Sequence, residues 1–167
     1  MFSILFFQGK TLIILYYIIN SMCSVNLTEF INIKEAREEE AASILVHIKH
    51  YRSQQEYEPI IKHAIQEVTK GLLSSQNKGM DCFNVVTIFP LDFEHKNMDM
   101  KLVIKLSQIM LKLFPDKLLK YYIYNPPRMF NIMWSLMKGI IGKELAGKVV
   151  VIKSDNTMVT NLDEICV

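Results

Sequence analysis

Four short apolar runs, separated by longer amphipathic segments, limit most strongly what this chain can fold into. Each run is rich in β-branched or aromatic residues and is too short for a buried helix, which is typical of a buried strand. The runs span residues 11–19, 82–89, 120–124 and 147–153. Strands joined by helical crossovers pair in parallel with right-handed connections. The sequence therefore predicts an α/β fold, a mostly parallel sheet of about four strands covered by helices.

The segments between these runs carry apolar residues at helical spacing. The expected helices span about 33–50, 57–72, 98–114 and 127–138. Asn32 and Glu35 form a capping-box pattern at the start of the first helix. Gly71 and Gly79 mark the end of the second helix and of its loop, so Ser74–Lys78 is expected to be a polar loop. The predicted order is one strand, two helices, and then alternating strands and helices.

The first 25 residues are apolar but interrupted. Met1–Phe7 and Thr11–Ile19 are separated by polar residues and Gly9, so neither run approaches the ~20 residues of a membrane span. A secretory signal is the alternative, with Lys10 as its basic region and a cut near Cys23 or Ser24, but no A-x-A-like site follows. We favour the buried strand.

Composition excludes several classes of protein. Half of the residues are hydrophobic and 22% are charged, which excludes a disordered chain. A net charge of +2 is too small for a dedicated nucleic-acid binder. Cys23, Cys82 and Cys166 are widely spaced, so they form neither a disulfide framework nor a zinc site, and a reducing compartment is expected. Ten methionines and many aromatic residues indicate an apolar cavity or a membrane-facing surface.

Motifs of catalysis are missing from the sequence. It holds no glycine-rich phosphate loop, no G-x-S-x-G nucleophile turn and no H-E-x-x-H. Asp92, Glu94 and His95 share a loop after a strand, but no nucleophile accompanies them. His47 and His50 are interpreted as a solvated pair rather than a metal site. We therefore predict a protein that is not an enzyme, with no catalytic residues and no metal.

The segment Leu113–Lys153 carries a specific resemblance. It combines the stretch Phe114–Leu118, the strand Tyr121–Tyr124, the run Asn125–Pro127 and the aromatic-rich helix Met129–Ile141. This order resembles the CRAL-TRIO lipid-binding family, which includes retinaldehyde-binding, α-tocopherol-transfer and yeast phosphatidylinositol-transfer proteins. The resemblance implies a single CRAL-TRIO-like domain over residues 1–167 with its core at 9–155. Relative to the family pattern, the domain is truncated at both ends.

In this family the helix after the N-x-P run is a mobile gate over the lipid. The apolar residues of the 129–141 helix occupy nearly every side, so periodicity alone fits either plain core or a gate. The resemblance implies that the lipid-binding gate residues are Met129, Phe130, Met133, Trp134, Met137, Ile140 and Ile141. It also suggests Asp116 and Lys148 as head-group contacts.

The implied function is that of a lipid carrier or sensor. The expected ligand is a phospholipid, a phosphoinositide or an isoprenoid-type lipid, held in an apolar cavity with no other cofactor. Phosphatidylinositol binding and a cytoplasmic location with transient contact with membranes are implied, whereas nucleic acid is not an expected partner. The alternative is a degenerate scaffold that binds proteins, for example small GTPases, without transferring lipid.

Overall fold

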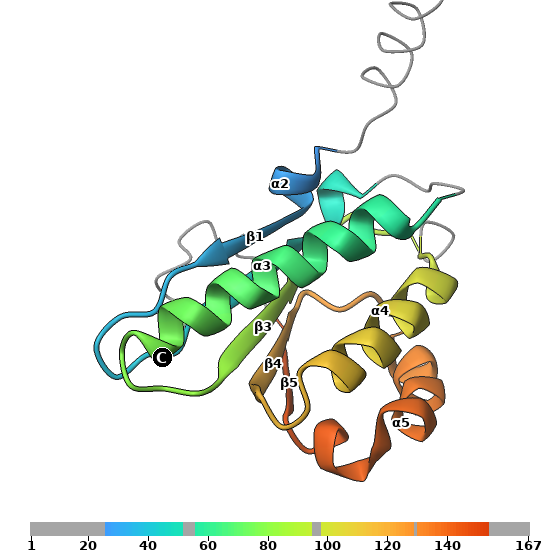
Figure 1. The fold of residues 1–167 in the computed structure, drawn as a ribbon. Coiled ribbons are helices and arrows are strands. Elements are labelled where there is room, and N and C mark those ends of the chain that lie inside the picture. Colours follow the sequence, from blue (N-terminus) through green and yellow to red (C-terminus); the bar gives the residue numbers. More distant parts are fainter. Residues whose placement is uncertain (1–25, 52–55, 95–97, 129, 154–167) are drawn as a thin grey trace, which may run out of the picture.

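A computed structural model of the chain describes residues 26–51, 56–94, 98–128 and 130–153, and these form one sheet with helices on one side (Figure 1). The sheet has five strands in the order β1-β2-β3-β4-β5, so the predicted α/β fold is confirmed. β1 is antiparallel to β2, and the remaining neighbours pair in parallel. The strands are β1 Ile31–Lys34, β2 Ser43–His47, β3 Phe83–Ile88, β4 Leu118–Tyr124 and β5 Val149–Ile152. The strand predicted at 11–19 lies outside the described residues.

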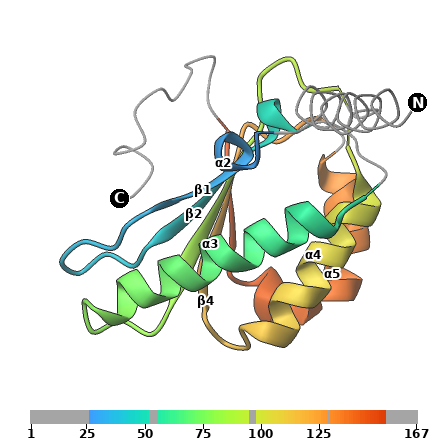
Figure 2. The ribbon, with the colours of Figure 1, turned by 45° about the horizontal axis from the view of Figure 1, so that its top comes forward.

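Helices connect the parallel strands. They are α2 Leu27–Phe30, the 3₁₀ turn η1 Ile48–His50, α3 Glu58–Gln76, α4 Met100–Leu113 and α5 Phe130–Ala146. Because β2 to β5 follow one another in sequence order, right-handed crossovers carry α3, α4 and α5 to the same face of the sheet. Figure 2 shows these helices together on that face.

The predicted helix over 33–50 is wrong, because this segment forms a hairpin and the strand β2. Arg37 and Glu40 pair across the hairpin, and Glu39 adopts a positive φ of 66° at its turn. Ile44 and Leu45 are adjacent and point to opposite faces of the sheet, yet they are only 2% and 4% exposed. Apolar residues at successive positions fit a strand buried on both faces as well as one side of a helix, and pairing with β1 and β3 decides the outcome.

α3 does not end at Gly71, and the loop predicted at 74–78 is largely helical. The helix continues to Gln76, and the turn follows at Asn77–Gly79, where Gly79 has a φ of 79°. The hydroxyl of Ser75 accepts a hydrogen bond from the Ala42 amide at 2.8 Å, and Ser74 accepts one from Ala36 at 3.0 Å. These polar side chains therefore tie the last turn of α3 to the chain entering β2.

The other predicted elements are confirmed with shifted ends. α4 begins after Asp99, whose carboxylate accepts a hydrogen bond from the Leu102 amide at 3.1 Å, and ends before Pro115. The last helix is longer than the 127–138 prediction, because α5 passes Gly139 and reaches Ala146. Its helical geometry is broken at Gly142, where φ is 79° and ψ is 164°.

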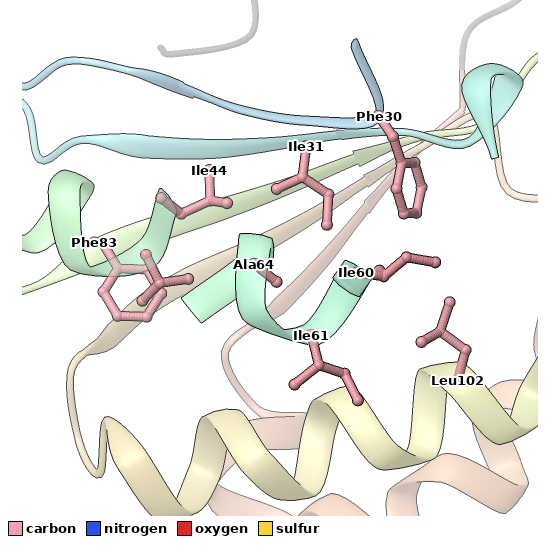
Figure 3. Close-up of a cluster of buried hydrophobic side chains, with 9 residues drawn as sticks. Phe30, Ile31, Ile44, Ile60, Ile61, Ala64, Phe83 and Leu102 are labelled. Atoms are coloured by element: carbon pink, nitrogen blue, oxygen red, sulfur yellow. The ribbon is translucent and has the colours of Figure 1, made fainter. Parts of the chain in front are cut away.

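The main core lies between α3 and the sheet. Figure 3 shows Ile60 and Ala64 of α3 near Phe30 and Ile31, while Ile61 lies on the side of α4. The buried members of this cluster are Phe30, Ile31, Ile44, Ile60, Ile61, Ala64, Val68, Phe83 and Leu102. A separate cluster around Leu45, Val86 and Tyr124 lies on the opposite face of the sheet. The fold is therefore held mainly by α3, and α5 belongs to a different cluster.

Gly71 allows α3 to lie close against β2, which predicts a large effect of adding a side chain there. A Cβ at Gly71 would lie 2.7 Å from Cδ1 of the buried Ile44. We expect Gly71→Val to lower the free energy of unfolding by about 1–3 kcal/mol, because the core must shift to admit it. Urea unfolding followed by circular dichroism measures this change.

The matched control is Gly139→Val, since a Cβ at Gly139 meets nothing within 4 Å. That change should leave the stability within about 0.5 kcal/mol of the original. Equal effects of the two substitutions would show that α3 does not approach β2 as described.

Candidate functional site

Phe130, the first residue of α5, is fixed on the sheet. Its side chain is 8% exposed and belongs to a cluster with Phe89, which follows β3, and Ile123 of β4. A hydrogen bond from its amide to the Pro127 carbonyl, 2.8 Å long, closes the turn after the two prolines and starts the helix. The aromatic ring at the start of α5 therefore anchors this end of the helix to β3 and β4.

Trp134 lies one turn further along α5 and extends this aromatic surface. Its ring stacks on that of Phe130, with centroids 6.0 Å apart and planes at 11°. The Lys138 ammonium lies 5.8 Å from the centroid of the indole ring, within the range of a cation–π contact. Unlike Phe130, Trp134 is only half-buried, so part of its ring is available to another molecule.

The sheet surface beside these rings is apolar, with one polar pair. Half-buried Tyr121 of β4 and Val149 of β5 pack against the Phe130 cluster. The Tyr121 hydroxyl lies 3.0 Å from Oγ1 of Thr87. Burial raises the pKa of the Tyr121 phenol, although the hydrogen bond with Thr87 opposes this shift. The phenol therefore stays neutral over the physiological range and suits an apolar site.

Packing on the helix-covered face of the sheet is uneven. Under α3, Ile44 and Phe83 are 2% and 3% exposed. Val151 of β5 pairs in register with Ile123, so its side chain is on the same face, but it is 41% exposed. The half of the sheet near α5 therefore presents apolar surface that the described residues leave partly uncovered.

The other predicted gate residues receive no test from the structure. Met129 lies outside the described residues. The side chains of Met133, Met137, Ile140 and Ile141 also lie outside them, although their backbone is part of α5. The gate role of this helix stays a prediction, with Phe130 placed as an anchor and Trp134 at the partly open surface.

Asp116 and Lys148, the head-group candidates, lie at the same edge of the sheet. Asp116 occupies the turn before β4, with a positive φ of 60°, and its side chain is exposed. Lys148 immediately precedes β5 and is half-buried, and its carbonyl accepts the Tyr121 amide at 3.0 Å. Both therefore lie near the amino ends of β4 and β5. In the same region Lys117 forms an ion pair with Asp81.

A carboxylate that the sequence did not reveal as a site residue joins α4 to the chain after β2. The Tyr51 hydroxyl donates to Oδ2 of Asp99 at 2.8 Å, and the Tyr57 hydroxyl donates to both oxygens at 2.9 and 3.0 Å. Burial alone would raise the pKa of Asp99, but hydrogen bonds from the Leu102 amide, both tyrosines and the Lys101 amide lower it. Tyr57 and Tyr51 precede Asp99 by 42 and 48 residues in the sequence, so no local pattern could predict these contacts.

This arrangement predicts a pH dependence of stability. The pKa of Asp99 in the folded state is below its ordinary value of 3.8, so its stabilisation is complete above about pH 3.8 and is lost as the pH falls through the lowered folded pKa. We expect Asp99→Ala to lower the free energy of unfolding by about 0.5–2 kcal/mol at neutral pH, with a smaller difference in acid. Asp92→Ala is the control on an exposed aspartate. A difference that is constant from pH 7 to acid would contradict the assignment to Asp99.

Comparison with known protein families decides what kind of fold this is. Residues 37–166 match the CRAL/TRIO domain, a span of well over half the chain. The chain belongs to the CRAL/TRIO family. The resemblance predicted from the segment Leu113–Lys153 is therefore confirmed, and CRAL/TRIO domains are a family of lipid-binding domains. No curated protein matches the sequence.

A solved CRAL/TRIO-like fold is found in the crystal structure of Sfh5. The two structures superpose with a TM-score of 0.65 at 18% sequence identity. The match covers 81% of this chain and 52% of the Sfh5 chain, so this chain spans about half the length of that protein. At this identity the likeness concerns the fold.

The histidines of this CRAL/TRIO domain form no metal centre with their described neighbours. The rings of His47 and His50 lie 6.3 Å apart, and His50 Nδ1 lies 3.3 Å from a carboxylate oxygen of Glu29. Burial, with the nearby Lys49 and His50, lowers the pKa of His47. Across the described parts of the chain, no group of three His, Cys, Asp or Glu residues is placed to hold a metal ion. Within the same ranges, no helix is long and apolar enough to cross a bilayer.

Proposed function

We propose that this CRAL/TRIO domain binds one lipid, with its hydrocarbon part against α5 and the β4–β5 half of the sheet, and acts as a carrier or sensor rather than an enzyme. The observation that supports this is the partly uncovered apolar surface formed by Trp134, Tyr121, Val149 and Val151. A group of exposed apolar side chains on a face that is buried elsewhere is typical of a surface that binds an apolar partner.

The free energy of binding would come mainly from burial of the lipid chain. Each methylene removed from water contributes about 0.8 kcal/mol, so a chain of ordinary length outweighs the cost of ordering the ligand. The stacked rings of Phe130 and Trp134 offer flat apolar area to such a chain. Methionines in the same helix suit a surface that repacks around flexible ligands.

The polar end of the lipid would lie at the amino ends of β4 and β5. There Lys148 offers a cation for a phosphate, and the exposed Asp116 offers an acceptor for hydroxyl groups. This placement favours a phospholipid or phosphoinositide over an isoprenoid. Delivery of such a ligand would bring the protein into transient contact with a membrane.

The single tryptophan of the chain provides a direct test, because Trp134 lies at the proposed surface. The full chain is incubated with vesicles that contain phospholipid with brominated acyl chains and is then separated from them. Bound brominated lipid should quench the emission of Trp134, whereas unlabelled lipid should not. Extraction then confirms that the protein carries lipid. If it does, and the emission of Trp134 is the same with brominated and with unlabelled lipid, the ligand lies elsewhere.

Absence of lipid from the protein after both incubations would reject lipid binding as a whole. It would favour the alternative function, a scaffold for protein partners.

A further inference from the structure

A hollow lies at the carboxyl ends of β3, β4 and β5, the end of the sheet opposite to Asp116 and Lys148. Its volume is about 690 Å³, within the range of pockets that hold small molecules. It is lined by the segment Pro90–Glu94, the segment Asn125–Arg128, and Lys153. The carboxyl edge is where open α/β sheets generally bind ligands.

Backbone pairing brings the three strand ends together. The Asn125 amide donates to the Ile152 carbonyl at 3.1 Å, so Asn125 lies beside the position where Lys153 leaves β5. The Phe89 amide donates to the Tyr124 carbonyl at 3.1 Å, which places the end of β3 on the other side. These hydrogen bonds bring residues from three separate loops to one hollow.

The polar groups of this hollow include both donors and acceptors without partners. Arg128 and Lys153 are exposed and form no ion pair with any residue that the structure describes. Oδ1 of Asn125 is buried and accepts no hydrogen bond, while Nδ2 of the same amide donates to the Phe89 carbonyl at 3.5 Å. A buried amide oxygen without a donor is costly unless a ligand supplies one. Asp92 adds an exposed carboxylate at the rim.

We propose that this hollow binds a phosphorylated polyol, with the phosphate at Arg128 and Lys153 and hydroxyl groups at Asn125 and Asp92. A phosphate is the anion that two neighbouring cations recognise, because charge-assisted hydrogen bonds to its oxygens are strong. The amide oxygen and the carboxylate accept hydroxyl hydrogens, of which a polyol phosphate has several and inorganic phosphate in its dianionic form only one. The ligand is either a free sugar phosphate or the head group of a lipid. This site is separate from the proposed lipid surface beside α5.

The soluble form is tested by titrating glucose 6-phosphate, inorganic phosphate and glucose into the full chain, with amide chemical shifts as the readout. We expect glucose 6-phosphate to bind most tightly, with shifts at the carboxyl edge. Arg128→Gln and Lys153→Gln should each weaken its binding by about tenfold or more. The matched control is Lys120→Gln, an exposed lysine near the amino end of β4, which should change nothing.

The role of Asn125 is tested by Asn125→Gly, because glycine tolerates the φ of 51° at this position. This variant should lose the preference for glucose 6-phosphate over inorganic phosphate while retaining the binding of phosphate. An unchanged preference would overturn the assignment of the hydroxyl contact.

The lipid form is tested with phosphatidylcholine vesicles with and without phosphatidylinositol. A head-group ligand predicts binding that depends on phosphatidylinositol, falls in Arg128→Gln and is displaced by glucose 6-phosphate. If glucose 6-phosphate binds and vesicles with phosphatidylinositol do not, the ligand of the hollow is a free phosphate ester. The proposal is overturned if neither ligand binds, or if Lys120→Gln weakens binding as much as Arg128→Gln does. Quenching of Trp134 by brominated lipid is also measured in Arg128→Gln. It reports whether the lipid surface beside α5 still binds lipid when binding at the hollow is weakened, so the failure of one proposal can be told from the failure of the other.

Discussion

Ile60→Ala is expected to lower the free energy of unfolding by about 2–5 kcal/mol, a large part of the stability of a domain of this size. Ile60 is 0% exposed and lies in the first turns of α3 beside Phe30 and Ile31 (Figure 3). Truncation leaves a cavity between α3 and the sheet that neighbouring side chains cannot fill completely. Urea unfolding followed by circular dichroism gives the difference.

The matched control is Leu73→Ala on the same helix, because Leu73 is 55% exposed. Its effect should stay within about 0.5 kcal/mol. If both substitutions cost the same, α3 does not seal the main core as described.

Trp134→Asp is expected to abolish lipid loading while most of the fold survives. The side chain is half-buried at the surface beside α5, and the main core under α3 does not include it. A carboxylate at this position meets hydrocarbon when lipid binds, at a cost of several kcal/mol, which corresponds to a loss of at least a hundredfold in affinity. Lipid loading from vesicles and a thermal melting curve are measured together.

Two control variants make this experiment specific. Trp134→Phe keeps an aromatic surface and should retain most of the loading, and Ser135→Asp places the same charge at an exposed neighbouring position of α5. If Trp134→Asp unfolds the whole domain, the tryptophan is a core residue and not part of a lipid site. Normal loading in a folded variant would remove Trp134 from the site altogether.

Sequence patterns predicted best the elements whose ends are set by local chemistry. Pro90 and Pro115 limit β3 and α4, and Asp99 starts α4 through its side chain, so these boundaries were close to those found. The hairpin at Arg37–Glu40 was missed because the apolar residues of β2 also match a helical face. Only pairing with strands distant in sequence selects between the two structures.

The candidate site was predictable only in part, because its motifs are local whereas the contacts of its residues join distant parts of the chain. The resemblance identified the segment that contains Phe130 and Trp134 and named Asp116 and Lys148 as head-group candidates, which the structure places near the amino ends of β4 and β5. The partners of these residues could not be predicted, because Phe89, Ile123 and Val149 come from three different parts of the chain. The same holds for the tyrosines on Asp99 and for the hollow at the carboxyl edge.

The most direct test of lipid binding is a native mass spectrum of the full chain after gentle purification. We expect a folded species whose mass exceeds that of the chain by one lipid, and we expect Trp134→Asp to lose this increment. Denaturing extraction should release the same lipid. A folded protein at the mass of the chain alone, which also acquires no lipid from vesicles, would contradict lipid binding by this domain.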